Sequence, residues 1–420
     1  MELFVKQIFL YSILFSGVSF EFFGRHFNIE RIVYVILLVP VSLYFLTVLT
    51  NKNAIIEQRS KSVYISAILW PICLLLSSIF SNDFASHLPG LVISLAPSLV
   101  YYIFSTGQSP ETIIRKNISI ILWVVSISTI FTYSAWLLLG SNIVENMVDS
   151  DGRVKLMTFE PNILGSLIGY LWILHFPYFK KALSCYILYV LVFLSLVFTF
   201  SKAPYLAFFA AFVLYMYLNG YTKKIKHLSI IIPFILLLII VIDSNGVEEF
   251  YNIYLNREDS LDSRMIGLNI AWARFVNSIW LGNGPLDFSL HPDLIIYLIG
   301  SNLDSDAWIW QMIVAILHDT GIIGLLCYLI WLFVVFSKSI KNYFVTKSKH
   351  DASYIASFFL LLIASQATTV HLTATFGMAF GILASIAVIK NEGDYCNEIE
   401  ARGNKTNYWI GLSGRQPTSW

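Results

Sequence analysis

Arg264 has the residue type and the position to bind a negatively charged group. It lies in the stretch 262–285, DSRMIGLNIAWARFVNSIWLGNGP, which predicts a helix that ends at the run LGNGP. With Asp262 or Ser263 as the N-cap, Arg264 falls in the first turn, where free backbone N–H groups and the helix macrodipole favour an anion. We therefore predict that Arg264 binds a phosphate. The alternative is an ion pair with Asp262 or Asp259.

His318 is the first candidate for a general base, because imidazole titrates close to neutral pH and can take up a proton during a reaction. Asp319 and Asp306 are the next candidates, either as the base or as the group that orients the histidine. All three lie in the stretch 305–326, SDAWIWQMIVAILHDTGIIGLL, which begins with a capping signal and predicts a helix that continues into an apolar segment. The alternative role for His318 is that of a hydrogen-bonded structural group at a helix boundary.

The composition shows that membrane helices must position these residues. Hydrophobic residues make up 57% of the sequence, charged residues only 13%, and the mean hydropathy is +0.70, which excludes a soluble globular fold. A net charge of +1 argues against a nucleic-acid partner, because binding to phosphates needs an excess of cations. The four cysteines show neither a disulfide framework nor a zinc pattern, and we expect no metal and no cofactor.

We predict an all-α polytopic membrane protein of about 12 transmembrane helices, each formed by an apolar run long enough to cross the hydrocarbon core. The runs lie near residues 7–23, 31–49, 63–80, 88–105, 117–139, 162–178, 183–200, 204–218, 227–243, 320–337, 353–369 and 371–389. The first run lacks a convincing cleavage site, so we interpret it as a retained helix and not as a signal peptide.

Loops rich in Lys and Arg alternate along the chain with loops that contain few of them. Because cytoplasmic loops carry the excess of positive charge, this alternation predicts that both termini are in the cytoplasm. On this topology residues 1–243 contain helices 1 to 9, residues 244–318 form a large extracytoplasmic loop with amphipathic helices, residues 319–390 contain helices 10 to 12, and residues 391–420 form a polar cytoplasmic tail. The large loop is too long for a simple connection and is rich in tryptophan, which indicates a folded, functional segment. We expect Trp272, Trp308 and Trp310 to stack on sugars; the alternative is that they anchor the loop at the membrane interface.

The cations predicted on the outer side are mostly arginines. Six of the eight outer cations are Arg, whereas only two of the fourteen inner ones are. Topology needs only charge, but the arginine fork also binds phosphate through two hydrogen bonds. Lys202, Arg153 and Arg257 therefore join Arg264 as candidate phosphate ligands, with lipid headgroups and ion pairs as the alternative. Lys202 stands at the outer end of a predicted span, where a charged residue is costly and often functional.

The order of several short motifs resembles the O-antigen ligase and polymerase superfamily. The pair Ser263-Arg264, then Trp272, then Leu281-Gly282-Asn283-Gly284 is similar to the family's SR pair, tryptophan and GxG element. The run 319–325, DTGIIGL, is similar to its acidic-x-Gly-x-x-Gly-Leu entry into the next helix. Two upstream segments also resemble family elements: Phe200-Ser201-Lys202, and Arg153 with Phe159-Glu160-Pro161-Asn162. The segment Trp308-Ile309-Trp310-Gln311 departs from the pattern, because ligases commonly have a His-Asn pair there.

The resemblance implies a protein of the bacterial cytoplasmic (inner) membrane and a metal-independent glycosyltransferase that uses an undecaprenyl-diphosphate-linked donor on the outer face. We expect a polymerase of a surface polysaccharide (O-antigen, capsule or exopolysaccharide) that transfers the growing glycan to a lipid-linked repeat unit. Arg264 and Lys202, with Arg153 or Arg257, would bind the diphosphate, and His318, Asp306 or Asp319 would accept the proton. Expected partners are the lipid-linked oligosaccharide, membrane lipid, and other assembly proteins such as a flippase or a chain-length regulator.

Two other functions compete with the polymerase. An O-antigen ligase would use the same donor but transfer the glycan to the lipid A core of lipopolysaccharide, and the missing His-Asn pair argues against it. A transporter or flippase of lipid-linked sugars would show related halves and helices broken at mid-membrane. The sequence shows neither of these features, and its one long non-spanning segment is the predicted outer loop 244–318. These features favour chemistry at the membrane surface over transport.

Overall fold

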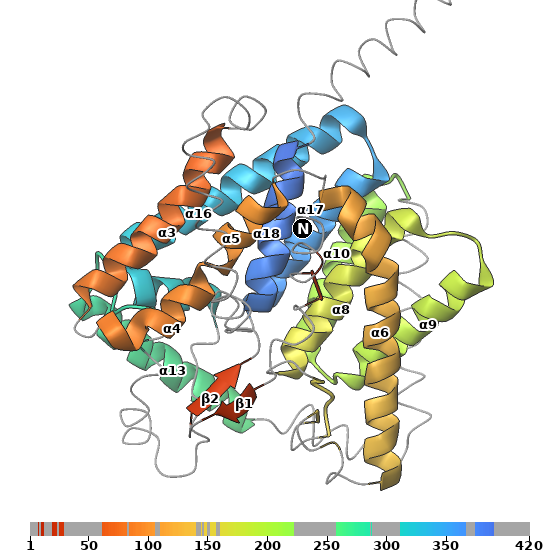
Figure 1. Ribbon diagram of the computed structural model, residues 1–420, viewed down its shortest axis with the longest axis horizontal. Helices are drawn as coiled ribbons and strands as arrows, with labels where there is room; N and C mark the ends of the chain where they lie inside the picture. The colour runs from red at the N-terminus through yellow and green to blue at the C-terminus, as the bar shows by residue number, and fades with distance from the viewer. Residues whose placement is uncertain are drawn as a thin grey trace, which may run out of the picture.

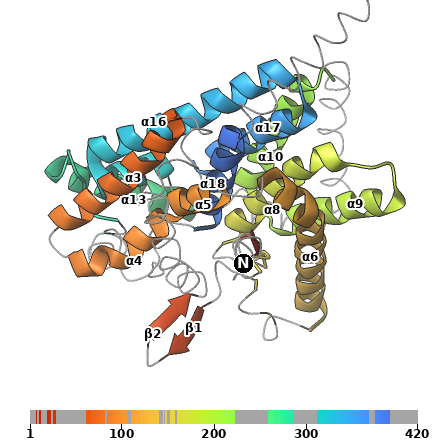
Figure 2. The ribbon, with the colours of Figure 1, turned by 45° about the horizontal axis from the view of Figure 1, so that its top comes forward.

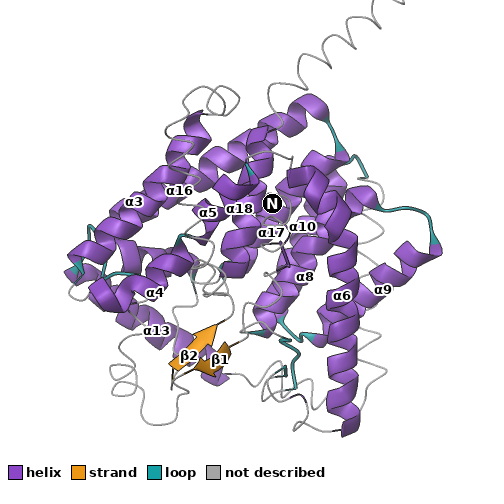
Figure 3. Ribbon diagram, viewed as in Figure 1, coloured by secondary structure: helices purple, strands orange, loops and turns teal. Residues whose placement is uncertain are grey.

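The structure is a computed structural model, and helices make up nearly all of it (Figure 3). It describes residues 7, 10–11, 19–22, 25–28, 61–81, 84–105, 110–139, 144, 147–148, 152–156, 160–221, 258–285, 287, 311–366 and 374–389. The helices of the first half are α3 (Lys61–Phe80), α4 (Phe84–Ser94), α5 (Ala96–Phe104), α6 (Pro110–Leu139), α8 (Pro161–His175), the short 3₁₀ helix η2 (Phe176–Tyr178), α9 (Leu183–Phe198) and α10 (Lys202–Leu218). Those of the second half are α13 (Glu258–Asn277), α16 (Met312–Thr346), α17 (Lys349–Ala364) and α18 (Ala374–Ile389).

Three helices of the described part are long and apolar enough to cross a membrane. They cover Ser62–Phe80 in α3, Glu111–Leu139 in α6 and Met312–Thr346 in α16. The helices α9 and α10 are apolar too, but shorter. Phe131 on α6 and Phe333 on α16 are each more than 70% exposed, and such large exposed apolar side chains suit a lipid environment and not water. The chain is therefore a membrane protein by the length and composition of its helices.

The helices pack against one another around a large apolar core (Figures 1 and 2). α3 lies along α16, α5 lies against α18, α10 packs between α8 and α17, and α6 packs on α9. Trp70, Tyr101 and Trp331 are among the largest fully buried side chains of this core. The indole N–H of Trp70 donates to the carbonyl of Ser94 at 2.9 Å, so the polar edge of a buried ring is satisfied.

Contacts between helix ends fall into two groups. At what we call the Tyr343 end, Tyr343 bonds to Leu218, Asn342 donates to the Ala387 carbonyl at 3.2 Å, and Ser119 lies 2.8 Å from His175. At what we call the Asp319 end, the Ser77 hydroxyl donates to the Asp319 carbonyl at 2.5 Å and the Met312 amide donates to Ser365 at 3.1 Å. Helices that cross a membrane in alternating directions would bring their ends together in two such groups, one on each side of the membrane.

The structure departs from two of the predicted spans. Within the expected helix 7–23, Ser19–Phe22 is a strand, β1, paired antiparallel with β2 (Arg25–Asn28), whereas the rest of the described chain is almost entirely helical. The expected span 88–105 is formed by α4 and α5, which meet at Leu95; this residue keeps helical φ and ψ, and the amides of Leu95 and Leu99 still donate to the carbonyls four residues back, but the regular helix is interrupted there. The reason is Pro97, which lacks an N–H and whose ring crowds the carbonyl of the preceding turn. The predicted runs 31–49 and 227–243 lie outside the described residues.

The start of α13 also differs from the prediction. We expected Asp262 or Ser263 as the N-cap, but the helix begins at Glu258, so Arg264 is its seventh residue. The first four N–H groups of a helix are those without an intrahelical acceptor. Arg264 therefore lies beyond the turn in which the helix N-terminus itself favours an anion, and the prediction of a first-turn site was wrong. The side chains of residues 258–266 lie outside the described part of the structure.

Candidate functional site

The loop after α13 is joined to a break in α16 by an exchange of backbone hydrogen bonds. α16 is interrupted at Gly321, whose φ of 65° and ψ of −168° are outside the helical range. The amides of Ile322 and Ile323, which in an unbroken helix would bond four residues back, donate instead to the carbonyls of Ile279 and Trp280, at 2.9 and 3.3 Å.

The two carbonyls that lose these partners are those of His318 and Asp319. They accept from the amides of Asn283 and Gly284, each at 2.9 Å. These four backbone groups are thus paired with the loop, as buried backbone groups require. The two glycine-containing motifs, LGNGP and DTGIIGL, meet at this junction.

Glycine is needed on both sides of the junction. Gly282 has φ +69° and Gly321 φ +65°, a region that other residues rarely adopt. A Cβ atom at Gly282 would overlap the backbone of Asp319, and one at Gly321 would overlap the backbone of Trp280. The glycines therefore allow the close approach that brings the residues on either side of them together.

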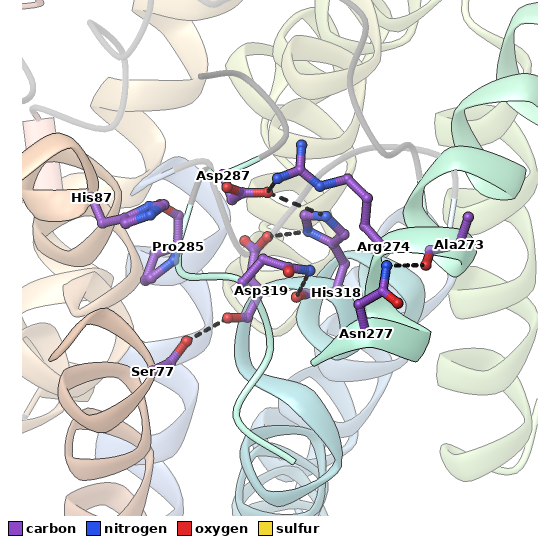
Figure 4. A network of polar contacts seen from close by, with 10 residues as sticks. Ser77, His87, Ala273, Arg274, Asn277, Pro285, Asp287, His318 and Asp319 are labelled. Atoms are coloured by element: carbon purple, nitrogen blue, oxygen red, sulfur yellow. Dashed lines mark hydrogen bonds and ion pairs between the residues drawn. The ribbon is translucent and has the colours of Figure 1, made fainter. Parts of the chain in front are cut away.

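Four charged or titratable side chains converge at this junction (Figure 4). Arg274, from α13, lies 2.7 Å from the carboxylate of Asp287. Nδ1 of His318 lies 2.9 Å from Asp319, and Nε2 lies 3.6 Å from the same Asp287 oxygen that Arg274 contacts. His318 is thus held between two carboxylates, one of which also pairs with Arg274. We call these four side chains the Arg274 cluster.

The cluster is buried except at Arg274. The side chain of His318 is fully buried, those of Asp319 and Asp287 are 3% and 6% exposed, and that of Arg274 is 23% exposed. Charges taken out of water need close partners of opposite sign. In the cluster the Arg274 guanidinium is the partner of Asp287, and the imidazole of His318 is the partner of Asp319. Arg274 is the member that a molecule outside the cluster reaches first.

Side chains from α3 and α4 support the junction from the other side (Figure 4). Ser77 of α3 donates to the carbonyl of Asp319 at 2.5 Å, in addition to the Gly284 amide. His87 of α4 is buried and its Nδ1 lies 3.0 Å from the carbonyl of Pro285. Its ring lies directly over Gly284, where a Cβ atom would overlap it. Three parts of the chain that are far apart in the sequence, residues 77–87, 274–287 and 318–323, therefore determine the shape of this site.

The structure brings some of the predicted site residues together and leaves others elsewhere. His318 and Asp319 are in the Arg274 cluster. Trp272 is on α13 and is 57% exposed, and the backbone of Arg264 is two turns or more further toward the start of that helix. The predicted residues Asp306, Arg257, Trp308 and Trp310 lie outside the described residues.

Arg153 and Lys202 belong to a second group, near the starts of α8 and α10. The amide of Val154 donates to the carbonyl of Phe198, the last residue of α9, at 3.1 Å, which joins the segment of Arg153 to the connection before Lys202. Lys202 is the first residue of α10 and is exposed. The Arg274 cluster and its supports come instead from α3, α4, α13 and α16 and from the loop after α13. The candidate cations are therefore divided between two groups of helices.

Sequence reasoning did not assign Asp287 or Arg274 to the site. A signal for Asp287 is present, because it is an acid in the apolar run GPLDFSL just after the glycine motif. Arg274 is one of the six arginines predicted on the outer side, and nothing in its spacing marks it as the partner of an acid thirteen residues later. In the described parts of the chain, no group of three or more His, Cys, Asp or Glu side chains is arranged to hold a metal ion.

Comparisons with known proteins do not identify a family. No protein-family model matches the sequence, and no curated protein matches it significantly.

Proposed function

We propose that this protein is a membrane glycosyltransferase that polymerises a bacterial surface polysaccharide on the outer face of the cytoplasmic membrane. The donor would be a glycan on undecaprenyl diphosphate and the acceptor a lipid-linked repeat unit. The observation that carries this proposal is the Arg274 cluster, in which a histidine between two carboxylates and an arginine meet where two glycine motifs join. Support also comes from the position of this junction at the ends of apolar helices, where a lipid-linked substrate carries its polar head.

The reaction needs one proton transfer and charge neutralisation. The acceptor hydroxyl oxygen attacks the anomeric carbon of the donor sugar, and the bond between that carbon and the diphosphate oxygen breaks. The hydroxyl proton passes to a base, and cations stabilise the negative charge that develops on the leaving diphosphate. In this proposal Arg274 joins Arg264 as a diphosphate ligand, because it is the most exposed member of the cluster. Lys202, Arg153 and Arg257 remain candidates for a second contact.

His318 is the proposed base, with Asp319 as the residue that orients it. Asp319 holds Nδ1 at 2.9 Å, so Nε2 is the nitrogen directed at Asp287. The 3.6 Å between Nε2 and Asp287 is longer than a hydrogen bond. A displacement of Asp287 away from both His318 and Arg274 would let an acceptor hydroxyl approach Nε2, and the same displacement would free the guanidinium for the donor.

The reaction can be tested in a strain from which the gene is deleted and to which either the wild-type gene or a single variant is returned. Wild type should restore long surface polymer, whereas Arg264→Ala and Arg274→Ala should leave single repeat units, since each would remove a diphosphate ligand. Surface glycan and lipid-linked glycan are separated on gels, and membrane levels of each variant are measured alongside. Lys341→Ala is the matched control, because it removes an exposed cation near the Tyr343 end of α16.

The outcomes separate the competing functions. Full-length polymer that accumulates on its lipid carrier would identify a ligase, and loss of lipid-linked units from the outer face would identify a flippase. A fully active Arg264→Ala variant would remove Arg264 from the site. Polymer made by the deletion strain at wild-type length would refute the polymerase proposal.

The orientation of the Arg274 cluster has its own test. The four cysteines are first replaced by serine, and single cysteines are introduced as Asn277→Cys in α13 and Lys341→Cys in α16, both at exposed positions. A membrane-impermeant maleimide added to intact cells should label position 277 and leave position 341 unlabelled until the cells are opened. The reverse pattern would place the cluster on the cytoplasmic side and exclude a periplasmic or outer-surface reaction.

A further inference from the structure

The C-terminal half of α13 exposes a continuous apolar stripe. Trp272, Val276, Ile279 and Trp280 are exposed by 57%, 51%, 39% and 67%. Their spacing of four, three and one residues places them along one side of the helix and its following turn. We call these four residues the α13 stripe. Two exposed tryptophans in one such stripe are costly in water, which indicates that something covers them.

The other sides of α13 have different partners. Ala271 and Phe275 are buried, and through them the helix packs on α16. Asn269, Ala273 and Asn277 are exposed on a third side, four residues apart. At about 100° per residue, the buried side, the α13 stripe and this polar side follow one another around the helix. α13 therefore lies with one side on protein, one apolar side uncovered and one side suited to water or polar headgroups.

The α13 stripe continues the apolar outer surface of α16. The carbonyls of Ile279 and Trp280 accept from Ile322 and Ile323, so the end of the stripe is beside the first turn after the break in α16. Ile323, Leu326 and Ile330 follow along α16 and are exposed by 39%, 53% and 48%. α16 is one of the helices that can cross a membrane, and its exposed apolar side chains are the kind that face lipid.

We propose that the α13 stripe lies in the interface of the lipid bilayer, so that α13 is an interfacial helix between the membrane and the protein. Tryptophan is the residue that favours this depth, because its ring is apolar and its N–H is polar. The helix matches the requirements for interfacial binding, with an apolar side and a polar side along the same axis. This inference does not depend on the glycosyltransferase proposal.

The position of α13 has a consequence for the Arg274 cluster. Arg274 belongs to the same helix, and the loop that carries Gly282 and Asp287 follows directly from it. At about 100° per residue Arg274 lies on the side of α13 opposite the α13 stripe, so a helix held at the interface would direct Arg274 away from the acyl chains and toward the headgroups. The cluster would then meet a phosphate-bearing lipid without that lipid leaving the membrane.

Single labelled cysteines test the proposal in vesicles. Starting from the chain in which serine replaces the four cysteines, Trp272→Cys and Val276→Cys report on the α13 stripe, and their neighbours Ala273→Cys and Asn277→Cys are the matched controls on the polar side. Each is labelled with the fluorophore NBD and reconstituted in phosphatidylethanolamine–phosphatidylglycerol vesicles. We expect brominated acyl chains to quench positions 272 and 276 at least about twofold more than 273 and 277, and aqueous iodide to show the opposite order.

Equal quenching at all four positions, or strong iodide access at 272 and 276, would overturn the proposal. A second measurement avoids the cysteine replacements. A photoreactive benzophenone amino acid is placed at Trp272 or at Asn277 in the otherwise native chain and irradiated in cell membranes. Lipid adducts at 272 and few at 277 are expected; protein adducts at 272 in place of lipid would show that a protein partner covers the stripe.

Discussion

Gly321→Ala should prevent stable folding. The residue has a backbone conformation that is almost restricted to glycine, which costs about 1–3 kcal/mol for any other residue. The added Cβ atom would also overlap the backbone of Trp280, which cannot move without breaking the exchanged hydrogen bonds, and overpacking of this kind costs about 1–3 kcal/mol more. The sum, roughly 2–6 kcal/mol, is a large share of the stability of an ordinary protein. Fluorescence-detected size exclusion and thermal unfolding in detergent measure the effect.

Gly220→Ala is the matched control for this prediction. Gly220 follows α10 with φ +74°, a similar left-handed value, but nothing lies within 4 Å of a Cβ atom built there. Its replacement carries only the conformational cost, about 1 kcal/mol. Gly282→Ala should resemble Gly321→Ala, because its Cβ atom would overlap the backbone of Asp319. If Gly321→Ala and Gly220→Ala unfold at the same temperature, the close approach of the loop to α16 is wrong.

Removal of one partner in the Arg274 cluster should cost more than removal of both. Arg274→Ala leaves Asp287 as a buried carboxylate without its guanidinium partner, and Asp287→Ala leaves Arg274 without its acid. We expect each to destabilise the protein by about 1–3 kcal/mol, which is below the usual cost for a buried pair because Arg274 is partly exposed. The double variant should be more stable than either single variant, because neither charge is left without its partner, so the coupling should exceed one single effect, that is, about 1 kcal/mol or more. Thermal unfolding of all four proteins measures this coupling.

The pair of His350 and Glu111 provides the control for that cycle. Its atoms are 3.8 Å apart and its side chains are 32% and 28% exposed, at the Tyr343 end. Coupling between partly exposed ions is small, up to about 1 kcal/mol. Coupling at Arg274 and Asp287 no larger than at this pair would mean that the cluster contributes little to stability.

Glycan synthesis by the same variants separates structure from chemistry. If the cluster only stabilises the junction, the double variant Arg274→Ala/Asp287→Ala should recover polymer together with stability. If Arg274 binds the diphosphate, polymer should stay lost in the double variant although the protein is folded. His318→Gln, measured beside them, shows whether the imidazole itself is needed.

Several features followed from the sequence because they depend on neighbouring residues. Apolar runs long enough for a membrane predicted α3, α6 and α16, since the length of a run and its freedom from charge are local properties. The motifs LGNGP and DTGIIGL marked the positions where the backbone needs glycine. The division of α4 from α5 was also available from Pro97 but was missed, because the apolar run continues through it.

Other features were decided by tertiary structure. The backbone exchange at the break in α16 joins residues 35 positions apart (283 and 318, 284 and 319) and 43 positions apart (279 and 322, 280 and 323), and the Ser77 hydroxyl reaches the carbonyl of Asp319 across 242 positions. His318 is flanked by Asp287 as well as by its neighbour Asp319, and no spacing rule connects residues 287 and 318. The apolar residues of α13 divide between a buried side and an exposed stripe only because α16 covers one of them. Sequence periodicity determines which residues share a side of a helix, whereas the neighbouring helix determines whether that side faces protein or lipid.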